Sequence, residues 1–144
     1  MNKRGFTLLE ALLSIAAIGI IAGFSVPFYY AAQVRNDADN TIIMAAQNLR
    51  RAQLLAQSGE GDSPWGLYMQ QGSMTLFEGS SFGARDQDMD EIFTFAANMG
   101  VSGNQEFVFE KMTGEPVSTG TLNLLLSTGE QRTISVNEKG MISY

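Results

Sequence analysis

The chain opens with two basic residues, a glycine and an apolar run that holds one early carboxylate: Met1-Asn2-Lys3-Arg4-Gly5-Phe6-Thr7-Leu8-Leu9-Glu10-Ala11-Leu12-Leu13-Ser14-Ile15. The apolar run continues to about Tyr30, and the roughly 24 residues between Glu10 and Arg35 carry no charge. A charge-free stretch of that length is enough to cross a bilayer as a helix. Because the basic pair flanks its start, the positive-inside rule places that end in the cytoplasm and the rest of the chain outside.

Glu10 helps to decide among three interpretations of this N-terminal apolar segment. An ordinary signal peptide is cleaved after the apolar region, a plain anchor is not cleaved, and a third kind of leader is cut before the apolar region. A carboxylate costs roughly 2.5–3.5 kcal/mol near the centre of a membrane helix and less near its end. A signal peptide or a plain anchor gains nothing from that cost, so Glu10 favours the third interpretation.

A cut between Gly5 and Phe6 would give Glu10 a partner. The new α-amino group of Phe6 is positive near neutral pH, and Glu10 follows it by one helical turn. In a filament, the carboxylate of one subunit would meet the amine of a neighbour, and leaving either charge unpaired in a low-dielectric core is expensive. The pair would then set the axial register of the subunits. The alternative is a glutamate tolerated near the membrane interface.

The stretch Lys3–Leu13 resembles the class III leader and cleavage site of type IV pilins and type II secretion pseudopilins. The resemblance implies a leader of residues 1–5, cleavage by a prepilin peptidase after Gly5, and methylation of Phe6. It also implies that Glu10 is the family's glutamate at the fifth mature position and that Pro27 is its helix-kinking proline. A proline inside a helix removes a hydrogen bond and clashes with the preceding turn, so a break or bend is expected there.

The pattern of residues changes after the apolar segment 6–30. From 31 to 58, apolar residues recur at spacings of three and four, which marks one face of a helix. They are Val34, Ala38, Ile42, Ala45, Leu49, Ala52 and Ala56. We expect the helix to continue with this stripe packed on a head, and to end at the Gly- and Pro-containing segment Ser58–Pro64. The adjacent Arg50 and Arg51 are read as a solvated face.

Residues 59–144, called the head below, carry strand signals. Trp65–Met69 and Met74–Phe77 flank a predicted turn at 70–73, and Leu122, Leu124 and Leu126 alternate with other residues before a turn at 127–130. Such alternation with regular turns predicts an antiparallel sheet with an aromatic core. The fold class is therefore α+β, a long N-terminal helix packed on a small antiparallel β-rich head. Parts of the head, such as Trp65-Gly66-Leu67 and Gly114-Glu115-Pro116, are similar to GspH/FimT-like pseudopilins, which implies a β-sandwich-like head.

The amino-acid composition argues against several classes of function. The chain has 15 acidic and 9 basic residues, which argues against nucleic-acid binding, and it contains neither histidine nor cysteine. No phosphate-binding loop or nucleophile motif is present, so we expect no enzyme and no cofactor. The acidic cluster Asp86–Glu91 has carboxylates at alternating positions, as some Ca²⁺ sites do, but lacks the glycine and distant glutamate of an EF-hand. We read it as a solvated acidic loop, with calcium binding as the alternative.

The resemblance implies a structural subunit of a type IV pilus or a type II secretion pseudopilus, serving adhesion, motility, DNA uptake or protein secretion. Its partners would be other pilins in the filament, the prepilin peptidase, the assembly platform and motor, and the membrane. It would lie in the inner membrane with its head outside the cytoplasm, and then in a cell-surface or periplasmic filament. The alternatives are a minor or tip subunit of the same filament and, more remotely, a membrane-anchored enzyme or sensor.

Overall fold

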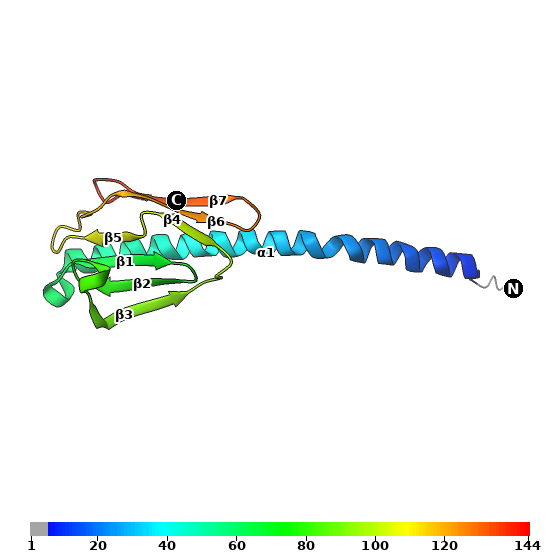
Figure 1. Cartoon of the computed structure of the whole chain (residues 1–144), viewed down its shortest axis with the longest axis horizontal. Helices are drawn as coiled ribbons and strands as arrows, with labels where there is room; N and C mark the ends of the chain where they lie inside the picture. Colours follow the sequence, from blue (N-terminus) through cyan, green and yellow to red (C-terminus); the bar gives the residue numbers. More distant parts are fainter. Residues whose placement is uncertain (1–5) are drawn as a thin grey trace. The chain divides into compact units, whose positions relative to one another are not determined.

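A computed structural model describes residues 6–144, apart from the side chains of residues 24–27. Within the described residues, one long helix precedes eight strands, which confirms the α+β fold class (Figure 1). The elements are α1 (Leu8–Ser58), η1 (Glu60–Asp62), β1 (Trp65–Gln70), β2 (Ser73–Glu78), η2 (Phe82–Ala84), β3 (Asp86–Thr94), β4 (Gly100–Gly103), β5 (Glu106–Phe109), β6 (Gly120–Leu125), β7 (Gln131–Val136) and β8 (Ile142–Ser143). The chain divides into two compact units, Met1–Gln33 and Val34–Tyr144, and α1 contributes residues to both.

The head strands form two four-stranded antiparallel sheets. Their orders are β3-β2-β1-β5 and β4-β6-β7-β8, so the second sheet is built from later parts of the chain except for β4. The predicted hairpin is confirmed, since β1 and β2 pair from Trp65↔Glu78 to Gln70↔Ser73. Gly72 sits in its turn with a φ of 83°, a value that favours glycine. β6 and β7 lie on either side of the predicted turn at 127–130 and pair from Gly120↔Val136 to Leu125↔Gln131.

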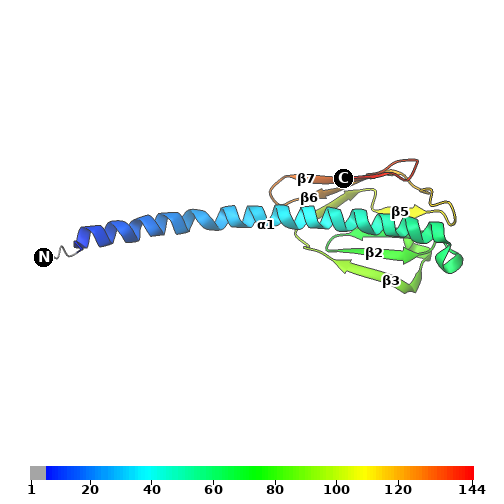
Figure 2. The same cartoon turned by 180° about the vertical axis from the view of Figure 1, so that it is seen from behind.

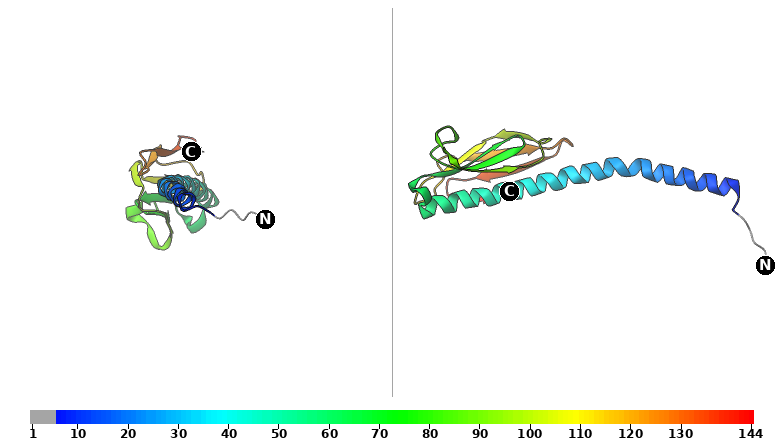
Figure 3. Two further views of the ribbon diagram at one scale, coloured as in Figure 1. Left: turned by 90° about the vertical axis from the view of Figure 1, so that its right-hand side faces the viewer. Right: turned by 90° about the horizontal axis from the view of Figure 1, so that it is seen from below.

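The second half of α1 packs along both sheets. Every residue of the predicted stripe is buried, with exposed fractions between 0% and 6%. Figure 2 shows this part of the helix crossing the head, with β2 and β3 on one side of it and β6 and β7 on the other. One core cluster joins helix residues such as Leu49 to Leu67 and Phe107 of the first sheet and to Leu124 of the second. The two sheets therefore share a core with this part of the helix. In the right-hand view of Figure 3 the strands run along one side of it.

Two helix glutamines fasten the head backbone to α1. The Gln53 side-chain amide donates to the carbonyl oxygens of Gly114 (3.0 Å) and Gly140 (3.3 Å), and Gln57 donates to that of Thr113 (3.4 Å). Both glycines have positive φ, and a Cβ on either would lie 2.4 Å from a glutamine side chain. These two glycines are thus required by the close approach of the loops to the helix.

The acidic segment 86–91 is not the predicted loop. It forms most of β3, the longest strand of the head and an edge strand of its sheet. Edge strands expose unpaired backbone groups, and charged side chains discourage edge-to-edge aggregation. Segment 86–91 contains no glycine or proline, but its charged residues favoured a loop over a strand in the prediction from sequence. The acidic side chains are better explained as protection of an exposed edge.

The backbone of α1 is helical through residue 27. The side chain of Pro27 lies outside the described residues, so the kink expected there stays a prediction. At its C-terminal end α1 stops at Ser58, and Gly59 follows in the left-handed region with a φ of 70°. A glycine in that conformation is a common helix terminator, because it adopts positive φ without steric cost.

Candidate functional site

The described chain begins at Phe6, the second residue of the predicted processing site. Gly5 lies outside the described residues, whereas Phe6 is described and its side chain is 83% exposed. Phe6 and Thr7 precede the first helical residue, Leu8. The predicted cut between Gly5 and Phe6 would therefore fall two residues before the first helical residue.

Thr7 caps the start of α1. Its side-chain oxygen accepts a hydrogen bond from the backbone N–H of Glu10 at 3.3 Å, and its carbonyl oxygen accepts from the N–H groups of Glu10 and Ala11 at 3.1 and 3.2 Å. A capping threonine satisfies donors that a helix N-terminus otherwise leaves unpaired. The cap holds the first turn and thereby fixes where the Glu10 side chain leaves the helix.

Thr7 was missed as a site residue. The pattern Thr7-Leu8-Leu9-Glu10 followed by an apolar run has the spacing of a capping box, in which a Ser or Thr precedes a Glu by three residues. That signal was present in the sequence. Glu10 also lies in the first helical turn, where the helix dipole favours a negative charge.

Glu10 presents its carboxylate on an otherwise apolar surface. Among the residues that the structure describes, none forms a hydrogen bond or ion pair with this carboxylate, while the Glu10 carbonyl oxygen accepts from the Ser14 hydroxyl at 2.7 Å. An acid that has no partner among the described residues of its own chain is available to a partner from another molecule. The predicted partner, the Phe6 amine of a neighbouring subunit, is a proposal taken up below.

Large apolar side chains surround Glu10. Phe6 is 83% exposed, and the leucines and isoleucines of α1 up to Ile21 are between 58% and 80% exposed: Leu8, Leu9, Leu12, Leu13, Ile15, Ile18, Ile20 and Ile21. The helix is long and apolar enough at this end to cross a membrane, by length and composition. A helix that is apolar on all sides is suited to lipid or to burial among other helices.

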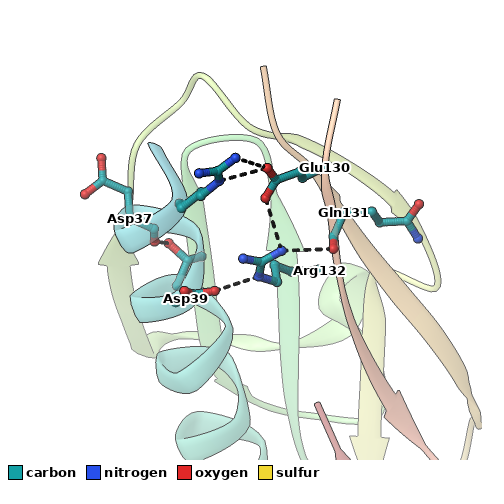
Figure 4. A network of polar contacts seen from close by, with 7 residues as sticks. Asp37, Asp39, Glu130, Gln131 and Arg132 are labelled. Carbon is teal, nitrogen blue, oxygen red and sulfur yellow. Dashed lines mark hydrogen bonds and ion pairs between the residues drawn. The ribbon is translucent and has the colours of Figure 1, made fainter. Parts of the chain in front are cut away.

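A second polar cluster ties α1 to the turn between β6 and β7 (Figure 4). Arg35 donates to Glu130 at 2.8 Å, Arg132 donates to Asp39 at 2.6 Å, and Arg132 also lies 3.7 Å from Glu130. The hydrogen bond from Arg35 is the main cause that lowers the pKa of Glu130 below its ordinary value. The hydrogen bond with Glu130 likewise raises the pKa of Arg35, and the one with Asp39 raises that of Arg132. These contacts fasten the head to the helix.

Several basic residues of α1 and of the head lie against acidic or aromatic side chains. Arg51, read from the sequence as solvated, pairs with Glu91 of β3, and the Arg50 guanidinium lies 5.5 Å from the centre of the Tyr144 ring. In the part of the chain that the structure describes, no group of three or more Asp or Glu side chains is placed to hold a metal ion. The acidic residues of β3 are instead partly used in ion pairs, as in Arg85–Asp90 at 2.8 Å.

The chain is similar to one family model and to a solved structure. Residues 1–26 match the family model described as the prokaryotic N-terminal methylation motif. The N-terminus is pilin-like. Among solved structures, the minor pseudopilin EpsH from the Type 2 Secretion System of Vibrio cholerae matches this pilin-like chain with a TM-score of 0.56 and 14% sequence identity, over 74% of this chain and 94% of that chain. No curated protein matches the chain.

The two matches support the sequence interpretation at different levels. The methylation motif covers the predicted leader, the predicted cleavage site and the first part of α1, and confirms the resemblance to pilins and pseudopilins. At this level of identity the structural match shows a shared fold, which is that of a pseudopilin. Together with the exposed apolar helix, the motif indicates a membrane-anchored chain with its head outside the membrane.

Proposed function

We propose that this pilin-like chain is a structural subunit of a type IV pilus or a type II secretion pseudopilus. The observation that carries the proposal is a methylation motif leading into a capped helix, whose first turn holds an acid with no partner among the described residues. The pseudopilin fold of the rest supports the same conclusion. The chain acts by packing and pairing, and the energy for assembly would come from platform and motor proteins.

Processing comes first in the proposed sequence of events. A prepilin peptidase cuts between Gly5 and Phe6 and methylates the new amino group of Phe6. Lys3 and Arg4 hold the leader on the cytoplasmic side during insertion, and the apolar segment remains in the inner membrane. The head then lies outside the cytoplasm, and the subunit ends in a cell-surface or periplasmic filament.

Assembly follows from the chemistry of the helix start. A methylated amine keeps its positive charge, so the Phe6 amine of one subunit can neutralise Glu10 of the next in the apolar filament core. Removing one member of such a pair leaves a buried charge, which costs about 3–5 kcal/mol. The pairing therefore selects one axial register of neighbouring helices, while Pro27 bends the helix to follow the filament.

A minor or tip subunit is the second candidate. The observation favouring it is the fold match to a protein described as a minor pseudopilin. Such a subunit would start the filament or bind a ligand at its end, with the same processing and membrane anchor. Abundance separates the two roles, because a major subunit forms filaments of this chain alone and a minor subunit does not.

N-terminal mass spectrometry of the mature protein tests the proposal. The expected mature chain begins at Phe6 and carries one methyl group on its amine. A Gly5→Leu variant should accumulate as uncut precursor, whereas Asn2→Ala, which changes the leader away from the cut, should be processed normally. A mature protein that retains Met1–Gly5, or that begins beyond Tyr30, would refute the proposed function.

A further inference from the structure

The outward side of the sheet β4-β6-β7-β8 carries no charged residue. Strand register places Leu122, Leu124, Ile134 and Val136 on the core side, because these residues are buried, so the residues between them point away from the core. We call these outward positions the neutral face: Gly100, Ser102, Thr121, Asn123, Leu125, Gln131, Thr133, Ser135 and Ser143. All are intermediate or exposed in accessibility, and Leu125 is 52% exposed.

A charge-free face of this kind stands out in an acidic chain. The chain has 15 acidic and 9 basic residues and a net charge of −6, yet the outward positions of four neighbouring strands contain none of them. The acidic residues gather elsewhere, for example along β3 from Asp86 to Glu91. Depletion of charge, more than bulk hydrophobicity, distinguishes the centre of a protein interface from other surface.

Part of the other sheet is covered by its own chain. Phe82 of η2 stacks on Tyr68 of β1 with ring centres 4.0 Å apart, and it meets Phe77 of β2 edge-on at 5.7 Å. The Arg85 guanidinium lies 3.8 Å from the centre of the Phe82 ring. As a result Thr75 and Phe77, which point away from the core, are only 4% and 0% exposed. No comparable segment buries the neutral face within the described residues.

Side chains on the neutral face are held by one another. The Thr133 hydroxyl donates to the Asn123 side-chain oxygen at 3.1 Å, and the Gln131 amide donates to the Thr133 hydroxyl at 3.4 Å. Groups that are already ordered lose less conformational entropy when a partner binds. Uncharged hydroxyls and amides are also less costly to remove from water than charged groups. The face is thus suited to contact with another protein.

We propose that the neutral face is a head-to-head contact whose occupant is a second copy of this chain. This inference rests on the proposed filament function, which brings many acidic heads close together. Like charges brought together at an interface cost several kcal/mol, so acidic heads approach most easily where one of them presents no charge. When the neutral face of one head meets a different surface of the next head, the contact is heterologous and can repeat along a helical filament.

A photo-crosslinking experiment identifies what covers the face. The chain has no cysteine, so a single introduced cysteine can be labelled without background. Full-length Thr133→Cys, labelled with a benzophenone maleimide, is irradiated in sheared filaments, with Gln87→Cys on the exposed β3 edge as the control. We expect adducts of twice the subunit mass from position 133, several-fold more abundant than from position 87. Equal or lower yield from position 133, or adducts only with a different protein, would overturn the proposal.

A charge variant gives an independent test. Thr133→Asp should lower the amount of this chain in filaments by roughly tenfold, whereas the uncharged Thr133→Asn should not, because only the former brings a charge to the contact. Folding of each variant is checked by fluorescence of Trp65, the sole tryptophan. Unchanged incorporation of folded Thr133→Asp would refute the contact.

The N-terminal mass of the same samples separates the two proposals. If the mature chain begins at Phe6 and enters filaments, but position 133 gives no dimer adduct, the face proposal fails and the proposed function stands. If the wild-type chain is never cut at Gly5 and never enters filaments, the proposed function fails, and the proposed contact between heads in a filament fails with it.

Discussion

The two halves of α1 share one secondary structure and differ in what surrounds them. In the first half, large side chains such as Leu8 and Ile15 are 80% and 68% exposed. In the second half, Ala38, Leu49 and Ala56 are at most 1% exposed, because they pack on the head. A helix with one apolar stripe can be satisfied within its own chain, whereas a helix that is apolar on every side needs lipid or other helices.

The position of the charges follows the same division. The buried stripe contains four alanines that let the head sheets approach the helix axis: Ala38, Ala45, Ala52 and Ala56. The exposed half has a single charged residue, Glu10, on a helix whose other residues are mostly apolar. The second half is therefore a folding element of the head, and the first half acts through contacts outside its own chain. The predictions below test that separation.

The largest expected effect is on assembly, from Glu10→Val. Without the carboxylate, the Phe6 amine of the neighbour has no partner in the filament core, which should lower incorporation roughly a hundredfold. Membrane insertion should be intact, because the variant removes a charge from an apolar segment. Quantitative blotting of sheared filaments against the membrane fraction measures both. Glu10→Asp, which keeps the charge, should retain part of the incorporation, and equal incorporation of Glu10→Val and wild type would contradict the pairing.

The next effect concerns stability and compares one leucine from each half. Leu49→Ala empties a buried site that is 1% exposed and should lower the free energy of unfolding of the head by about 2–5 kcal/mol. Leu13→Ala, at a site that is 64% exposed, should change it by less than about 0.5 kcal/mol. Urea unfolding of the detergent-solubilised full-length chain, followed by Trp65 fluorescence, measures both. A comparable loss for Leu13→Ala would show that the first half also supports the head.

Much of this division was predictable because its signals are local. The charge-free run to Arg35, the stripe from Val34 to Ala56 and the glycine-containing stop after Ser58 each occupy neighbouring positions in sequence. Helical and strand periodicity translate such patterns directly into faces. The hairpin of β1 and β2 was predictable for the same reason, since its turn joins strands that are adjacent in the chain.

Long-range features could not be obtained in this way. The pairing of β1 with β5, the insertion of β4 beside β6 and the contact of Arg35 with Glu130 join residues that are far apart in sequence. Segment 86–91 was misread because an edge strand carries charges that resemble a loop in composition. Thr7 was a different kind of miss, because its capping pattern is local and was overlooked beside the more specific leader motif.

A smaller effect is expected from Thr7→Ala at the start of the exposed half. Loss of the capping oxygen should destabilise the first turn by about 1 kcal/mol, so its amide protons should exchange several-fold faster. Hydrogen exchange of the N-terminal peptide of the mature chain in micelles measures this. Thr7→Ser keeps the oxygen and should exchange like wild type. Exchange of head amides should be unaltered in both, and faster exchange there would argue against independence of the two halves.

The smallest effect belongs to the contact between the second half of α1 and the β6–β7 turn. Because Arg35 lowers the pKa of Glu130 in the folded head, the ionised carboxylate stabilises the fold above its unfolded pKa of about 4.3. That stabilisation is lost as the pH falls through the lower folded value. Glu130→Gln should therefore be slightly less stable than wild type at neutral pH, and the difference should vanish in acid.

Urea midpoints of the full-length chain across this pH range measure the effect of Glu130→Gln. Glu138→Gln is the matched control, since Glu138 is exposed and has no ion pair among the described residues. A pH-independent difference between Glu130→Gln and wild type would mean that Glu130 acts through packing. A difference that vanishes in acid for Glu130→Gln alone would locate the charge-dependent part of head stability at the Arg35 contact, where α1 enters the head.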